Sequence, residues 1–245
     1  KYGNTISEIL KYSSKVEEEI HKIENLDEYH KKIKAKINVL KQELLEIANN
    51  MTNTRKKYAK ELSTKINKEL KDLEMPNARF EIQVDTADKF YETGIDEVEF
   101  MISMNPGEPT RPLATVASGG ELSRIMLAIK AVMADKDEIE TLIFDEIDVG
   151  ISGRTAQKVS EKMCLIGRKH QVICITHLAQ IAAMADTHYL IEKRVEDQMT
   201  KTKIRQLDGE ESVQELGRIL GGAKITDAVL ENAREMKILA SGLKK

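Results

Sequence analysis

The chain has 245 residues, of which 41% are hydrophobic and 32% charged, and its formal net charge is −3. Because the chain as a whole is not a polycation, any contact with nucleic acid must come from a local basic patch. The two cysteines show no disulfide or metal-binding pattern and no stretch is apolar enough to span a membrane, so we expect a reducing, cytoplasmic environment.

Residues 1–75 predict a helical arm of coiled-coil type. Apolar residues recur there at alternating spacings of four and three, at Ile33, Ile37, Leu40, Leu44, Ile47 and Met51. So narrow a stripe cannot bury itself, and the sequence holds no second long heptad segment to serve as its partner helix. The phase is disturbed at 25–28, where we expect a break. A solvated charged helix, or a disordered segment with helical bias, is the alternative.

Residues 76–245 predict a lobe of the α/β class. Pro76 ends the arm helix. Alternating apolar residues then predict two strands, one around Phe80–Val84 and one around Val98–Ile102, each with one buried face.

The rest of the lobe alternates between short apolar strands and helices. We expect helices at 119–133 and about 154–167, strands at 141–144 and 171–176, a closing hairpin at 188–194 and 202–207, and two final helices divided at Gly221–Gly222. Such alternation is typical of a mostly parallel sheet flanked by helices.

The segment Ser118-Gly119-Gly120-Glu121 opens the first helix of this region. Ser118 and Glu121 have the spacing of a capping box, and a well-capped helix would explain the segment by itself. Two glycines in a first helical turn cost stability, however, unless the backbone must approach something closely. Free N–H groups at a helix N-terminus attract phosphate, so a phosphate contact is the second interpretation.

The strand at 141–144 ends in two carboxylates, Asp145 and Glu146. Ligands of parallel sheets bind at the carboxyl ends of the strands. Asp145 suits Mg²⁺, held directly or through water, and Glu146 suits a water molecule that must be oriented or deprotonated. An acidic turn is the alternative, and Asp148 with the glycines that follow argues against it.

A second apolar strand ends at Thr176 and His177. A neutral imidazole in this place can hydrogen-bond to a phosphate oxygen or to water. Taken alone, His177 fits better as a histidine with satisfied hydrogen bonds at a strand end.

The order of these segments resembles the head of ABC-type ATPases, with its signature motif, Walker B strand, D-loop and switch histidine. Leu113–Lys130, Thr141–Lys158, Cys174–Asp186 and Met75–Phe80 resemble more specifically the RecN family of bacterial DNA-repair proteins, which are SMC-like ATPases. The resemblance covers essentially the whole chain. It implies the C-terminal half of such a protein, made of the returning coiled-coil helix and the C-terminal lobe of the head.

The resemblance also implies residue roles at an interface between two heads. Ser118, Gly119, Gly120 and Glu121 would form the signature motif, which contacts the γ-phosphate of ATP held by a second head. Asp148 would belong to the D-loop that crosses the same interface. Members of the family join two heads when ATP binds and separate them on hydrolysis.

Three further residues would carry the hydrolytic chemistry in that resemblance. Asp145 would be the Walker B aspartate, which holds Mg²⁺ through water. Glu146 would be the catalytic glutamate and His177 the switch histidine. The implied function is repair of DNA double-strand breaks and recombination.

A phosphate loop of the form G-x-x-x-x-G-K-[ST] is missing, because no glycine of the sequence precedes a lysine. In the resembled family this loop lies in an N-terminal lobe. We therefore expect the chain to need that lobe to bind ATP and Mg²⁺, and to be inactive alone. Another SMC-type chromosome or recombination ATPase and a non-catalytic coiled-coil interaction module are the competing functions.

The basic run Arg55-Lys56-Lys57 is a candidate contact for DNA phosphates. The alternative is that the run is only a solvated helix face, and this is the interpretation we favour. Since no base-reading motif is present, we expect any DNA binding to be independent of sequence.

Overall fold

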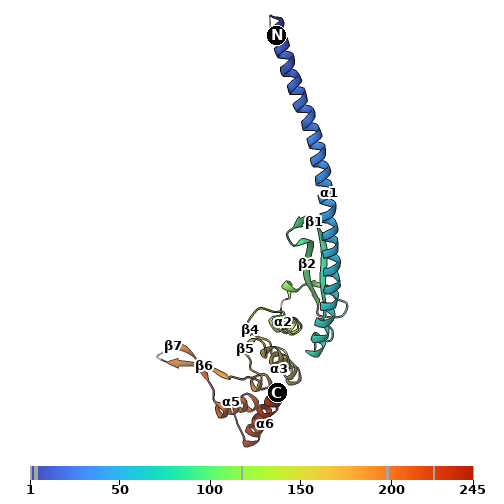
Figure 1. Cartoon of the computed structure of the whole chain (residues 1–245). Coiled ribbons are helices and arrows are strands. Elements are labelled where there is room, and N and C mark those ends of the chain that lie inside the picture. Colours follow the sequence, from blue (N-terminus) through green and yellow to red (C-terminus); the bar gives the residue numbers. More distant parts are fainter. Residues whose placement is uncertain (1, 3–4, 117, 197–198, 223, 245) are drawn as a thin grey trace. The chain divides into compact units, whose positions relative to one another are not determined.

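The computed structural model describes residues 2, 5–116, 118–196, 199–222 and 224–244 (Figure 1). Two compact units divide the chain, one of residues 1–57 with 84–97 and one of residues 58–83 with 98–245. The second unit thus includes the last part of the arm helix, so the predicted boundary near residue 75 stays a prediction. No helix among the described residues could cross a membrane.

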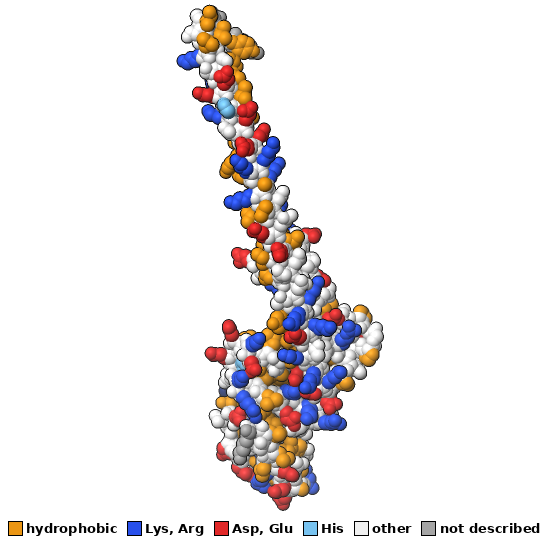
Figure 2. All heavy atoms as spheres, turned by 45° about the vertical axis from the view of Figure 1, so that its right-hand side comes forward, with side chains coloured by type: hydrophobic (Ala, Val, Ile, Leu, Met, Phe, Trp, Pro, Cys, Tyr) orange, Lys and Arg blue, Asp and Glu red, His pale blue; other side chains and the backbone are white. Residues whose placement is uncertain are grey.

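Helix α1 spans Ile6–Asp72 without interruption, and the break expected at 25–28 does not occur. That segment contains neither proline nor glycine, so a disturbed apolar phase leaves the backbone hydrogen bonds intact. The predicted stripe is exposed, with Ile33 at 40% and Leu40 at 53%. Figure 2 shows hydrophobic side chains between charged ones along this helix. The coiled-coil assignment therefore stays a prediction.

In the first unit, α1 is fixed to strand β2 (Gly94–Ser103) by the buried side chain of Asp96. Its carboxylate accepts hydrogen bonds from Thr52 Oγ1 at 2.6 Å and Arg55 Nη1 at 2.7 Å. Burial alone would raise the pKa of Asp96, but these two bonds outweigh it and the pKa lies below its ordinary value. Arg55 therefore belongs to a structural ion pair. For this residue, both the DNA contact and the solvated helix face were wrong interpretations of the 55–57 run.

The predicted elements of the lobe are present. Strands β1 (Arg79–Tyr91), β2 and β3 (Arg111–Pro112) form one sheet in that order. The short 3₁₀ helix η1 (Leu113–Thr115), α2 (Gly119–Met133), β4 (Thr141–Phe144), α3 (Gly153–Gly167), β5 (Gln171–Cys174) and α4 (Ala179–Ala183) follow. The chain continues with β6 (Tyr189–Glu196), β7 (Met199–Gln206), α5 (Gly209–Gly221) and α6 (Asp227–Leu243). Only the five-residue α4 and the short η1 and β3 were not predicted.

Strands β4 and β5 pair in parallel, with Phe144 opposite Cys174, as the alternation predicts. Leu142 and Phe144 are buried in the same hydrophobic core as residues of α2 and α3. Ile143 points the other way and is 67% exposed. The expected cover of helices is therefore present on one face of this two-stranded sheet.

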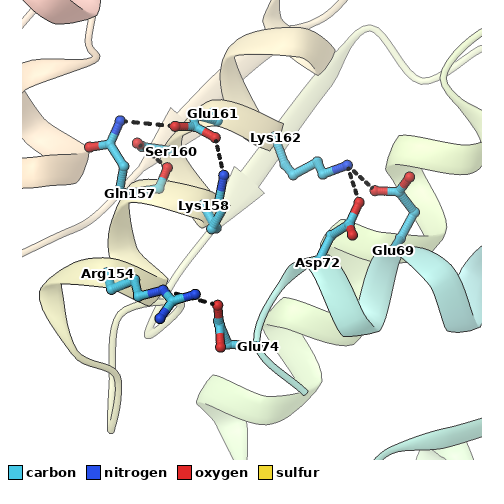
Figure 3. A network of polar contacts seen from close by, with 9 residues as sticks. All are labelled: Glu69, Asp72, Glu74, Arg154, Gln157, Lys158, Ser160, Glu161 and Lys162. Atoms are coloured by element: carbon cyan, nitrogen blue, oxygen red, sulfur yellow. Dashed lines mark hydrogen bonds and ion pairs between the residues drawn. The ribbon is translucent and has the colours of Figure 1, made fainter. Parts of the chain in front are cut away.

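The end of α1 is joined to α3 by ion pairs (Figure 3). Lys162 Nζ lies 2.5 Å from Glu69 Oε2 and 3.3 Å from Asp72 Oδ2, and Arg154 Nε lies 3.4 Å from Glu74 Oε1. Burial alone would lower the pKa of Lys162, but Glu69 and Asp72 raise it above its ordinary value. The carboxylates at the end of α1 thus form ion pairs with cations of α3.

We expect Lys162→Ala to lower the free energy of unfolding by about 2 kcal/mol, because the largely buried carboxylate of Glu69 would lose its cation. Lys158→Ala is the matched control on the same helix. Lys158 pairs with Glu161 at the surface, where the two side chains are 46% and 31% exposed, so its loss should cost less than about 1 kcal/mol. Urea unfolding measures both variants, and equal losses would contradict the importance of Lys162.

Candidate active site around the loop after β4

The loop at 145–150 is the centre of the candidate site. Asp145 and Glu146 are exposed, whereas Ile147 and Asp148 are 0% and 3% exposed. Glu146 has a φ of 56°, in the left-handed region that a residue with a side chain rarely adopts. Surrounding contacts must hold this conformation, since it costs about 1 to 3 kcal/mol.

The N-terminus of α2 packs closely against this loop. Ser118 Oγ caps the helix by accepting a hydrogen bond from Glu121 N at 3.4 Å. A Cβ at Gly119 would lie 2.1 Å from Glu146 Oε2, and one at Gly120 would lie 3.0 Å from the carbonyl oxygens of Glu146 and Val149. The close approach that the paired glycines require is therefore made, and the neighbour is the loop of this same chain.

Two further residues of α2, neither of them predicted as a site residue, hold the loop. Ser123 Oγ donates to Asp145 O at 2.7 Å. Arg124 Nη1 donates to Ile147 O at 3.3 Å and to Val149 O at 3.0 Å. Burial lowers the pKa of Arg124, while Glu121 acts in the opposite direction. The available signal was an arginine directly before the apolar run of α2, since a buried cation needs fixed acceptors.

Asp148 joins the loop to the end of β5. Its Oδ2 accepts hydrogen bonds from Thr176 Oγ1 at 2.5 Å and from His177 N at 2.7 Å. His177 Nδ1 lies 3.0 Å from the same oxygen, and the His177 side chain is 70% exposed. The predicted D-loop aspartate and switch histidine are thus in direct contact. Thr176, predicted only as a strand end, is a further positioning residue.

Asp145 is the candidate ligand for a metal ion. Its Oδ1 accepts a hydrogen bond from Glu146 N at 2.9 Å, and the residue is exposed. No group of three or more metal-ligating side chains occurs among the described residues. A single carboxylate fits Mg²⁺, which often takes one or two protein carboxylates and completes its shell with waters and substrate phosphates.

The sequence of the chain is similar to those of known bacterial proteins. No protein-family model matches the chain. The chain is 43% identical to the DNA repair protein RecN of Bacillus subtilis over 251 residues, and the match covers 96% of this chain and 44% of that protein. It is 41% identical to RecN of Halalkalibacterium halodurans, with 100% and 44% of the two chains covered. The chain is related to RecN. It spans less than half the length of these relatives and resembles their C-terminal half.

A solved structure supports the fold. The Smc head domain with a coiled coil and joint from Pyrococcus yayanosii matches with a TM-score of 0.57 at 17% identity, covering 86% of this chain and 38% of that one. The RecN-related chain therefore has the fold of an α/β head lobe that carries a long arm helix, as the sequence predicts.

The paired glycines of α2 give a contrast that can be tested. Gly120→Ala should lower the free energy of unfolding by about 1 to 3 kcal/mol, since its Cβ would meet two backbone carbonyls that cannot move alone. Gly119→Ala should be close to neutral, because the Glu146 side chain can turn away and alanine favours the helix. Thermal unfolding of both variants checks this, and a Gly119→Ala loss as large as that of Gly120→Ala would contradict it.

Cys174 reports the charge at the site. Burial raises the pKa of its thiol to about 12, with further contributions from Asp148 and Asp145. Only the thiolate is nucleophilic, so in a Cys164→Ser background the rate of alkylation should rise about tenfold per pH unit between about pH 8 and 11. Mass spectrometry follows the modification. A plateau near pH 9, the ordinary value for a thiol, would refute the shift.

Proposed function

We propose that the chain is the C-terminal part of an SMC-like ATPase in DNA double-strand break repair and recombination. One observation carries the proposal: the start of α2, the carboxylates after β4 and His177 after β5 converge on the loop at 145–150. Each segment has a simple structural explanation alone, and their convergence at the ends of two parallel strands is what a phosphate-processing site requires. The relationship to proteins named DNA repair protein RecN supports the biological role.

Each side chain then has a role that its position supports. The exposed Glu146 carboxylate would orient and deprotonate the attacking water, and the exposed His177 imidazole would hydrogen-bond to a phosphate oxygen. Ser118, Gly119, Gly120 and Glu121 would meet the γ-phosphate of ATP held by a second head. Asp145 would hold Mg²⁺ through water, and the ion would neutralise phosphate charge.

The environment of Asp148 refines the role that the resemblance implies. Its carboxylate is buried and accepts hydrogen bonds from Thr176 and His177 of the same chain. We therefore assign Asp148 to positioning His177, and leave a contact across the head interface to the neighbouring exposed residues Val149 and Gly150.

The proposal also requires partners. On the uncovered face of the β4–β5 sheet, Ile143, Ile173 and Ile175 are 67%, 45% and 49% exposed. Such a cluster of exposed apolar side chains favours a further lobe that packs there. We propose the N-terminal lobe with the phosphate loop as this partner. The other proposed partners are a second identical head, joined through ATP, and DNA that is bound without sequence preference.

The chain alone should hydrolyse ATP no faster than background, whereas the chain assembled with an N-terminal lobe should turn over. Phosphate release measures both. Glu146→Gln should abolish turnover of the assembled head by removing its base while ATP binding persists. An assembled head that binds ATP but stays inert with Glu146 intact would refute the assignment.

Two competing functions predict other outcomes. A non-catalytic interaction module would dimerise regardless of nucleotide, so gel filtration of the assembled head with and without ATP separates it from an ATPase. Ser118→Arg should remove an ATP-dependent dimer by placing a bulky cation at the interface. Another SMC-type chromosome ATPase would share these results, and only failure to restore break repair in cells would favour it.

A further inference from the structure

Four exposed lysines lie on the last turns of α1, at Lys60, Lys65, Lys68 and Lys71. At 100° per residue, Lys60, Lys68 and Lys71 fall within about 80° of helix circumference, and they extend over about 16 Å of helix. Lys65 continues the basic surface at one side, where the carboxylates of Glu61 and Asp72 are its neighbours, and Asp72 is the ion-pair partner of Lys162. We call these four side chains the lysine row.

The lysine row keeps its charge because the other carboxylates of this helix segment are engaged elsewhere. Lys162 of α3 lies against Glu69 and Asp72, and Arg154 lies against Glu74 (Figure 3). Among the described residues, none of the four lysines has an ion-pair partner. The network of Figure 3 therefore leaves an uncompensated cationic surface on the solvent side of α1.

Contacts of the end of α1 with the rest of the lobe fix the direction in which the lysine row points. Ile66, Leu70 and Leu73 are fully buried. Asn67 bonds to the backbone of Phe80 twice, donating to its carbonyl at 2.7 Å and accepting from its N–H at 2.8 Å. These contacts hold the end of α1 within the second unit and leave the four lysines exposed.

We infer that the lysine row binds the phosphate backbone of double-stranded DNA. This inference rests on the proposed function only for the choice of DNA as the polyanion, and it requires no nucleotide. Lysine acts as a point charge towards phosphate, and a row of about 16 Å matches several consecutive phosphates of a duplex. Aromatic side chains for base stacking and arginine forks for base edges are absent from the row, so binding is independent of sequence.

The β6–β7 hairpin carries the competing basic surface. Lys201, Lys203 and Arg205 alternate along β7 and are exposed. Arg205 pairs with Glu211 at 2.7 Å, and Glu192 lies opposite Lys203 in the strand register. Carboxylates thus neutralise part of this surface, which is why the lysine row is the stronger site.

The test measures binding of the full chain to short duplexes of two unrelated sequences, without nucleotide, over a range of salt concentrations. K68Q/K71Q should weaken binding about tenfold for both duplexes. The slope of log affinity against log salt should become shallower by about 2, since two phosphate contacts are lost. Unchanged affinity and slope, or no binding by the parent chain, would overturn the inference.

Three variants control the result. K68R/K71R keeps both charges and should bind like the parent, which separates charge from folding. K34Q/K36Q removes the same charge from an exposed part of the same helix and should leave binding unchanged. K201Q/K203Q tests the hairpin, and a larger loss there than in K68Q/K71Q would overturn the lysine row. In a separate assay without DNA, the assembled head with K68Q/K71Q should hydrolyse ATP at the parent rate. Failure of the DNA-binding inference can therefore be distinguished from failure of the proposed ATPase function.

Discussion

The lobe depends on the buried carboxylate of Asp148. A carboxylate with 3% exposure must find donors, and it finds them at the end of β5, in Thr176 and His177. This contact fixes two strand ends that are about 30 residues apart in sequence. From the other side, Arg124 and Ser123 of α2 bond to the carbonyls of the same loop. Glu146 can hold a left-handed conformation because both sides of its loop are fixed.

The same loop leads directly into α3, and α3 bonds to the end of α1. Arg154 is the second residue of α3 and contacts Glu74, while Lys162 contacts Glu69 and Asp72 two turns later. One helix therefore connects the candidate ATP site with the base of the arm. Its cations also occupy the carboxylates that would otherwise neutralise the lysine row. The candidate site and the end of α1 are thus linked through α3.

The sequence predicted most of the lobe because its elements are locally specified. The start of α2 follows from the Ser118 cap, and β4 follows from an apolar run bounded by polar residues. The predicted break at 25–28 was wrong because a change of apolar phase alters which side of a helix seeks a partner, without weakening backbone hydrogen bonds. Arg124 and Thr176 were missed because their partners are backbone carbonyls or carboxylates more than 20 residues away.

The sequence by itself determined the arm helix and the parallel strand pair and selected the residues proposed to process phosphate, since these depend on periodicity and residue type. The tertiary structure decided what those residues do to one another. It placed Gly119 and Gly120 against Glu146, made Asp148 the support of His177, and turned Arg55 from a surface cation into the partner of Asp96. Such pairings depend on which distant segments meet, and no local pattern encodes that.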